Sequence, residues 1–263
     1  MPTNNRSKPN PELIVSIHER VARITIARAS RRNALDSTCW QSLTDACADI
    51  AQHNDVAAVV LTGEGEHFSA GADIHEMREH IADAAWMADN QNCVGVALDA
   101  YANLPQPTIA LIRGSCYGGG CALAVSSDFR IAANDCRMAI APAKLGLTYR
   151  LVDCLRLHEL IGPAPSREML LLAREIDGET AMAWGMVTEV ASADLLDTKL
   201  NAMIEKLCAL SSYSQRSIKA TLRKIRDGQT ADDAETKKIF NAAFSGADFM
   251  AAAEAFKKNK EKE

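Results

Sequence analysis

The chain has 263 residues, of which 48% are hydrophobic and 24% charged, and this length can bury a large core. A net charge of -5 argues against a nucleic-acid-binding surface, and no apolar run reaches the ~18 residues of a membrane-spanning helix. The eight cysteines form no CxxC pair, a pattern typical of buried thiols in a reducing compartment, so we expect a cytoplasmic protein.

Strands and helices alternate over the first two thirds of the chain, after a polar, proline-bearing start that we expect to be a disordered tail (1–11). A helix capped by Asp36 or Ser37 is predicted by apolar positions three and four residues apart. The predicted strands are 13–17 and 21–27 as a hairpin, then 57–63, 108–114, 129–133 and 137–140. The predicted helices are 36–52, 86–104 and 119–127, and helices dominate from Leu151.

Two glycine-bearing loops follow the two most apolar predicted strands. They read "FSAGAD" (68–73) and "CYGGG" (116–120). Glycines at such places form tight turns or allow a ligand to approach the backbone. A helix that begins at Gly119 would direct free N–H groups and its positive dipole end toward that ligand. Such an arrangement suits an oxyanion.

Other motif interpretations fail on their spacing. Gly114, Gly118 and Gly120 fit a dinucleotide-binding pattern, but the Tyr-x-x-x-Lys that should accompany it is absent, because Tyr149 is followed by Asp153. No P-loop sequence occurs. The two histidines of "HEMREH" (75–80) are five residues apart, which places them on different faces of a helix. We therefore expect no metal site.

Four stretches together resemble the enoyl-CoA hydratase/isomerase (crotonase) family: "RRNALD" (31–36), 57–77, 107–133 and "AMAWGMVTEV" (181–190). The resemblance runs from about residue 12 to 260. It implies an α/β fold with a spiral core of ββα units (12–200) and a C-terminal helical trimerisation region (201–263). It also implies a homotrimer or a dimer of trimers, a coenzyme A thioester as substrate, and no separate cofactor.

The resemblance assigns roles residue by residue. The two backbone N–H donors for the thioester oxygen would be those of Ala72 and Gly119, and glycine at 119 is expected to leave room for the thioester. Coenzyme A would be bordered by Arg31, Arg32, Ala34, Leu35, Ala70, Asp73, Ile74, Gly118, Phe256 and Lys260. The alternative interpretation of Arg31 and of Arg32 is a solvated surface charge that binds no ligand.

Both glutamates of the family's hydratases are replaced in this chain. Alanine stands at the first position, Ala122, and proline at the second, Pro142. Hydration of a C=C bond needs a base for water and an acid for the α-carbon. Ordinary hydration therefore requires another group to substitute.

Tyr149 is the first candidate for that group. The loop with Pro142 and Tyr149 resembles that of methylmalonyl-CoA decarboxylase in the same family, although that enzyme carries histidine at the position of Ala72. Loss of CO₂ forms the enolate without a protein base. Arg150 nearby would instead stabilise a carboxylate. Asp153 and His75 are further candidates for the acid or base. If these residues have no catalytic role, Tyr149 is expected to be a hydrogen-bonded wall residue, Asp153 a residue at a helix start and His75 a surface residue.

Three classes of function stay open: an acyl-CoA lyase, best a decarboxylase; a hydratase or isomerase with a non-standard acid or base; and a catalytically weak acyl-CoA binder. RNA binding through the basic stretch 217–226 is disfavoured by the acidic balance of the chain. The Ile218, Leu222 and Ile225 stripe of that stretch predicts one buried helix face.

Overall fold

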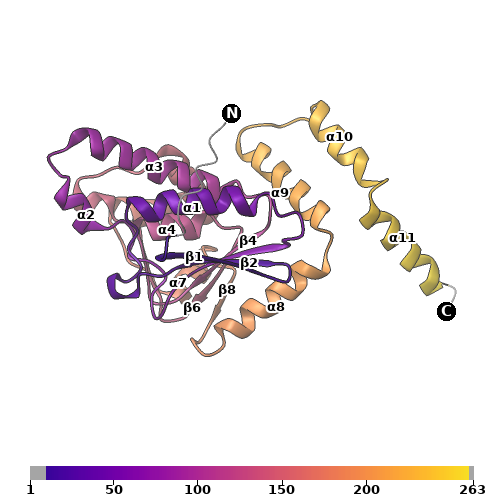
Figure 1. Cartoon of the computed structure of the whole chain (residues 1–263), viewed down its shortest axis with the longest axis horizontal. Coiled ribbons are helices and arrows are strands. Elements are labelled where there is room, and N and C mark those ends of the chain that lie inside the picture. Colours follow the sequence, from indigo (N-terminus) through magenta and orange to yellow (C-terminus); the bar gives the residue numbers. More distant parts are fainter. Residues whose placement is uncertain (1–9, 261–263) are drawn as a thin grey trace.

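A computed structural model describes residues 10–260, and the side chains of residues 10–254. Its centre is a six-stranded sheet in the order β1-β2-β3-β4-β6-β8 (Figure 1). The β1–β2 pair is antiparallel and every other neighbouring pair is parallel. The strands are β1 (Leu13–His18), β2 (Val21–Ile26), β3 (Ala58–Gly63), β4 (Thr108–Ile112), β6 (Phe129–Ala133) and β8 (Glu189–Ala191). A separate parallel pair joins β5 (Ser115–Tyr117) to β7 (Arg137–Ala139).

The core forms because helices cover both faces of the sheet. Every residue of β3 and β4 is buried, as expected of central parallel strands. On one side lie α1 (Ser37–Ile50) and α3 (Ala84–Ala102), and on the other lies α8 (Leu196–Ala209) (Figure 1). Asp36 caps α1 by accepting a hydrogen bond from the N–H of Cys39. The remaining helices are α2 (Ile74–Glu79), α4 (Gly118–Ser126), α5 (Leu151–Ile161), α6 (Pro163–Leu171), α7 (Gly178–Ala183), α9 (Ser212–Arg226), α10 (Ala234–Ala243) and α11 (Ala247–Lys260).

The predicted α/β fold and the order of its elements are confirmed, with ends that shift by a few residues. The third predicted helix begins at Gly118 rather than Gly119, with Tyr117 as its N-cap residue. The predicted boundary at residue 200 falls inside α8, where Leu196, Leu200 and Leu207 are all buried. Residues 1–9 of the predicted tail lie outside the described part of the chain.

The last two helices, α10 and α11, extend beyond the body of the molecule (Figure 1). The prediction of a buried stripe on α9 is wrong for the single chain, since Ile218, Leu222 and Ile225 are 59%, 61% and 60% exposed. The spacing correctly predicts an amphipathic helix, but nothing within the described part of the chain covers its apolar face. None of the helices between residues 10 and 260 has the length and hydropathy required to cross a membrane.

Candidate active site

The two predicted glycine-bearing loops meet through a short parallel pairing of Ser69 with Cys116. The N–H of Ser69 donates to the carbonyl of Ser115 at 3.0 Å, and the N–H of Tyr117 donates to the carbonyl of Ser69 at 2.9 Å. These bonds fix the loop after β3 against the strand that leads into α4. The structure thus brings together the segments that hold Ala72 and Gly119.

The N–H of Ala72 is directed toward the second loop by a bridge on its other side. Leu35 pairs with Ala72: the N–H of Leu35 donates to the carbonyl of Gly71 at 2.7 Å, and the N–H of Asp73 donates to the carbonyl of Leu35 at 2.9 Å. In a parallel bridge of this kind, the middle residue's own N–H points away from the partner strand. A Cβ built on Gly119 would lie 3.7 Å from the nitrogen of Ala72.

Gly119 is the second residue of α4, so its N–H belongs to the first helical turn and has no acceptor within the helix. The positive end of the helix dipole lies at this turn. Beyond it, the helix is anchored by a run of buried residues, Gly120 through Ser126. The Ala72 nitrogen thus lies close to the N-terminus of α4, where the helix dipole has the polarity that a developing oxyanion requires.

The glycines serve closer packing than expected. A Cβ on Gly119 would meet the Trp40 indole at 3.0 Å, and one on Gly120 would meet Ser69 at 2.6 Å. The missing side chain of Gly119 makes room for Trp40. The expectation that it also leaves room for the thioester stays a prediction. Open space lies at Gly118, where a Cβ would meet nothing within 4 Å.

Ala122 lies in the buried part of α4 beside Tyr149, whereas Pro142 lies in the loop before α5. Ala122 is 4% exposed and lines, with Ile140 and Tyr149, a void too narrow for a water molecule. Pro142 begins a 3₁₀ turn, Pro142–Leu145, that ends at Gly146 with φ of 69°. The methyl group of Ala122 and the aromatic ring of Tyr149 thus lie side by side.

Tyr149 reaches the glycine loop. Its hydroxyl donates to the carbonyl of Gly118 at 3.3 Å, one residue from the proposed oxyanion donor. Burial raises the pKa of the Tyr149 phenol well above its usual value, and the charge of Asp153 adds to this effect. The phenol is therefore neutral at neutral pH and acts as a donor rather than as a base.

Arg150 is held in an ion-pair network instead of facing the site alone. It contacts Asp153 at 2.7 Å and Asp99 at 3.2 Å, and Arg156 contacts the same two carboxylates at 2.9 and 3.0 Å. Asp153 lies in the first turn of α5, as predicted, and is also 5% exposed. Hydrogen bonding to Asp153 raises the pKa of Arg150. A buried Gly95 makes room for its guanidinium.

The residues assigned to coenzyme A are exposed to different degrees. Arg32 and Ile74 are exposed, as is Arg31, and Ala70 is half-buried. Leu35, Ala34 and Asp73 are buried. His75 is exposed, as predicted. Phe256 and Lys260 lie outside the residues whose side chains are described.

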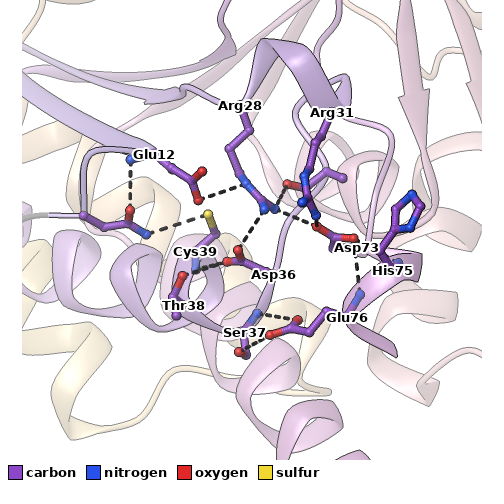
Figure 2. A network of polar contacts seen from close by, with 12 residues as sticks. Glu12, Arg28, Arg31, Asp36, Ser37, Thr38, Cys39, Asp73, His75 and Glu76 are labelled. Carbon is purple, nitrogen blue, oxygen red and sulfur yellow. Dashed lines mark hydrogen bonds and ion pairs between the residues drawn. The ribbon is translucent and has the colours of Figure 1, made fainter. Parts of the chain in front are cut away.

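A buried network behind the Ala72 loop was not predicted (Figure 2). Its centre is Arg28, which is 7% exposed. The sequence holds no local sign of this network, because the partners of Arg28 come from separate segments. Glu12, Asp36 and Cys39 place ligand atoms within 4.8 Å of one another. Arg28 already pairs with both carboxylates, and burial raises the pKa of the Cys39 thiol to about 12, so this group suits a guanidinium better than a metal ion.

Comparisons with known proteins point to one family of enzymes. The enoyl-CoA hydratase/isomerase family model matches residues 16–263. A short-chain-enoyl-CoA hydratase of Clostridium acetobutylicum is 30% identical, with 93% of this chain and 94% of that protein covered. A Delta(3,5)-Delta(2,4)-dienoyl-CoA isomerase of Dictyostelium discoideum is 25% identical over 87% of this chain and 81% of its own length.

The solved structure of an enoyl-CoA hydratase/isomerase family protein from Hyphomonas neptunium superposes with a TM-score of 0.91 at 28% identity, covering 94% of this chain and 95% of that one. Its fold and that of this chain are therefore the same over almost their whole lengths. The family match and this structural match cover almost the whole chain. The chain belongs to the enoyl-CoA hydratase/isomerase family.

Proposed function

We propose that the protein is an acyl-CoA enzyme that decarboxylates a methylmalonyl-CoA-type substrate. The observation that carries this proposal is the combination of Ala122 and Pro142 at the acid and base positions with the neutral Tyr149 hydroxyl beside the glycine loop. The N–H groups of Ala72 and Gly119 would bind the thioester oxygen as it becomes an enolate. Removal of one such donor typically costs ~10²–10³ in rate.

The proposed reaction needs no protein base in its first step. The bond between the α-carbon and the substrate carboxylate breaks, CO₂ leaves, and the electron pair of that bond moves into the thioester to form the enolate. The enolate then collapses as its α-carbon takes a proton from the Tyr149 hydroxyl, and water returns a proton to the phenolate. The raised pKa of Tyr149 keeps this proton in place until the enolate, a stronger base, has formed.

Two features of the residues around the glycine loop support decarboxylation over hydration. The apolar Ala122 carries no charge that would repel a substrate carboxylate. The charge of Arg150 is already matched by Asp99 and Asp153, so this arginine does not hold the carboxylate in its ionised ground state. Because relatives are named hydratases and isomerases, hydration or isomerisation by a non-standard acid or base is the second candidate, followed by acyl-CoA binding alone.

The test gives wild type and Tyr149→Phe each of two substrates in parallel. Release of CO₂ is measured with methylmalonyl-CoA, and loss of the enoyl chromophore is measured with crotonyl-CoA. Tyr213→Phe is the matched control, because its hydroxyl also donates to a backbone carbonyl, that of Ile239, at 2.8 Å. We expect CO₂ release that falls about 100-fold in Tyr149→Phe only. Hydration of crotonyl-CoA that is unchanged in Tyr149→Phe would contradict the proposal.

We also propose that the protein works as a homo-oligomer, trimer or hexamer, in the cytoplasm. The exposed stripe of α9 borders a groove of about 550 Å³ whose wall includes Phe129 and Leu160. A second copy of the chain would cover this apolar surface. All eight cysteines are free thiols, which supports a reducing compartment. Leu222→Asp tests assembly: we expect a smaller species in sedimentation, whereas an unchanged mass would contradict it.

A further inference from the structure

Arg28 is a buried cation directly behind the Ala72 loop. It follows β2, and its side chain is 6% exposed. Its Nε lies 3.0 Å from Glu12, its Nη2 2.9 Å from Asp36 and its Nη1 3.1 Å from Asp73 (Figure 2). These partners come from three separate segments of the chain. A buried guanidinium of this kind is stable only while its partners are present.

The contacts of Arg28 span the bridge that orients Ala72. On one side, Nη1 donates to the carbonyl of Ala34 at 2.6 Å, one residue before Leu35, which pairs with Ala72. On the other side, Nη1 contacts the carboxylate of Asp73, one residue after Ala72. A single guanidinium nitrogen therefore links the two strands of the bridge from behind.

Asp73 extends this link into α2. Its Oδ1 accepts hydrogen bonds from the N–H groups of His75 at 3.0 Å and Glu76 at 3.5 Å, while its Oδ2 faces Arg28 and Arg31. Glu76 in turn accepts from the N–H of Ser37 at 2.9 Å. The start of α2 is thereby held against the start of α1, and the loop that ends in Ala72 has little freedom to turn.

We propose that Arg28 is a positioning residue for the reaction: it sets the direction of the Ala72 N–H by clamping the bridge between residues 34–35 and 71–73. This inference rests on the proposed role of that N–H in binding the thioester oxygen. A displacement of about 1 Å at such a donor costs about 100-fold in rate. Arg28 itself does not touch the substrate.

Arg31 cannot replace Arg28, although it binds the same carboxylate oxygen. Its side chain is 53% exposed and it contacts Asp73 alone, and exposed ion pairs stabilise proteins by only about 0–1 kcal/mol. Lysine can replace Arg28 only in part, because its compact ammonium keeps the charge but lacks the planar fork that reaches partners in three directions.

The test measures enolate stabilisation separately from folding. Acetoacetyl-CoA is the probe, because its enolate absorbs in the near ultraviolet and facing N–H donors favour that form. The variants are Arg28→Met and Arg28→Lys. The matched control is Arg130→Lys, since Arg130 is also buried, at 5% exposure, and bonds to the carbonyl of Met186 at 2.6 Å.

In Arg28→Met we expect the bound enolate fraction to fall about tenfold and kcat for the substrate that wild type accepts to fall about 10- to 100-fold. KM should change less than about threefold, and Arg28→Lys should recover part of the loss. Arg130→Lys should lower the melting temperature without either change. A folded Arg28→Met or Arg28→Lys protein with wild-type enolate absorbance and kcat would overturn the inference.

A failure of the proposed function is recognised separately. If wild type neither turns over a thioester nor binds acetoacetyl-CoA as an enolate, the oxyanion role of Ala72 has failed. Amide exchange of residues 70–74 in the free protein then tests the clamp alone. We expect exchange at least about tenfold faster in Arg28→Lys than in Arg130→Lys. Equal exchange in the two variants would overturn the positioning role.

Discussion

The two amides of the proposed oxyanion site are held in place by different physical means. The Ala72 side depends on charge. Arg28 and Arg31 contact the carboxylate of Asp73, which directly follows Ala72, and Ala72 itself pairs with Leu35. The Gly119 side depends on shape: the N-terminus of α4 lies against Trp40, which is 1% exposed. An added atom should disturb the second side, and a lost charge the first.

This difference matters because the two kinds of support respond to different changes. Ion pairs weaken when a carboxylate is protonated or when salt screens an exposed partner. Close packing is indifferent to pH and salt but responds to a single added methyl group. The two sides of one site can therefore be disturbed independently.

Gly119→Ala should have the largest effect on catalytic activity. The new Cβ would lie 3.0 Å from Cζ2 and 3.2 Å from Cη2 of Trp40, so either the indole or the donor N–H must move. We expect kcat to fall by ~10²–10³, as for loss of a donor, and the free energy of unfolding to fall by about 1–3 kcal/mol. Steady-state kinetics and urea unfolding at two pH values measure both, and neither loss should depend on pH.

Trp40→Phe in the same chain is the control for this prediction. Phenylalanine lacks the outer ring atoms that the new methyl group would meet. The double variant Gly119→Ala/Trp40→Phe should therefore recover part of the lost kcat. If Gly119→Ala remains fully active, or if the double variant recovers nothing, then packing against Trp40 is not what positions this amide.

The sequence predicts the local part of this site and misses the long-range part. Glycines after apolar runs predict both loops, because hydrophobic patterns and turn residues act within a few positions. The Arg28 network joins Glu12, Asp36 and Asp73 across the chain, and such pairing leaves no periodic signal. The approach of Trp40 to Gly119 is tertiary in the same way. Spacing marks Trp40 only as a core residue of α1.

The exposed stripe of α9 is a second feature that depends on more than local spacing. The spacing of Ile218, Leu222 and Ile225 correctly predicts that one face of α9 is apolar. It contains no information on whether the same chain covers that face, and all three side chains are exposed in the single chain. The expectation that a second copy of the chain covers this face comes from the family resemblance instead. The sedimentation experiment on Leu222→Asp tests it.

Asp73→Asn comes next. It should lower the stability of the protein, and the size of this loss should depend on pH. Burial alone would raise the pKa of Asp73, but the hydrogen bond from Arg31, the N–H groups of His75 and Glu76, and the charge of Arg28 lower it below its usual value. A lowered pKa in the folded state stabilises the protein above the unfolded-state pKa of about 3.9, and this stability is lost as pH falls through the folded-state value.

We therefore expect Asp73→Asn to lower the free energy of unfolding by about 3 kcal/mol at pH 7, because it leaves Arg28 with one partner fewer. The difference from wild type should shrink below about pH 4. Urea unfolding from pH 7 to 3 measures this, with Asp45→Asn on the exposed face of α1 as a comparison variant. A difference that stays constant over this range would mean that the charge of Asp73 does not support its loop.

Arg31→Met should have the smallest effect on stability and separates binding from positioning. Its exposed pair with Asp73 should contribute less than about 1 kcal/mol, and 1 M salt should abolish that contribution. Because the family resemblance places Arg31 near the nucleotide of coenzyme A, KM for the coenzyme A thioester should rise while kcat stays within about twofold. The rise in KM should be absent with the matching pantetheine thioester, which lacks the nucleotide phosphates. A fall in kcat as large as that of Arg28→Met would instead mean that both arginines position Ala72, and the buried charge alone would no longer explain how that amide is held.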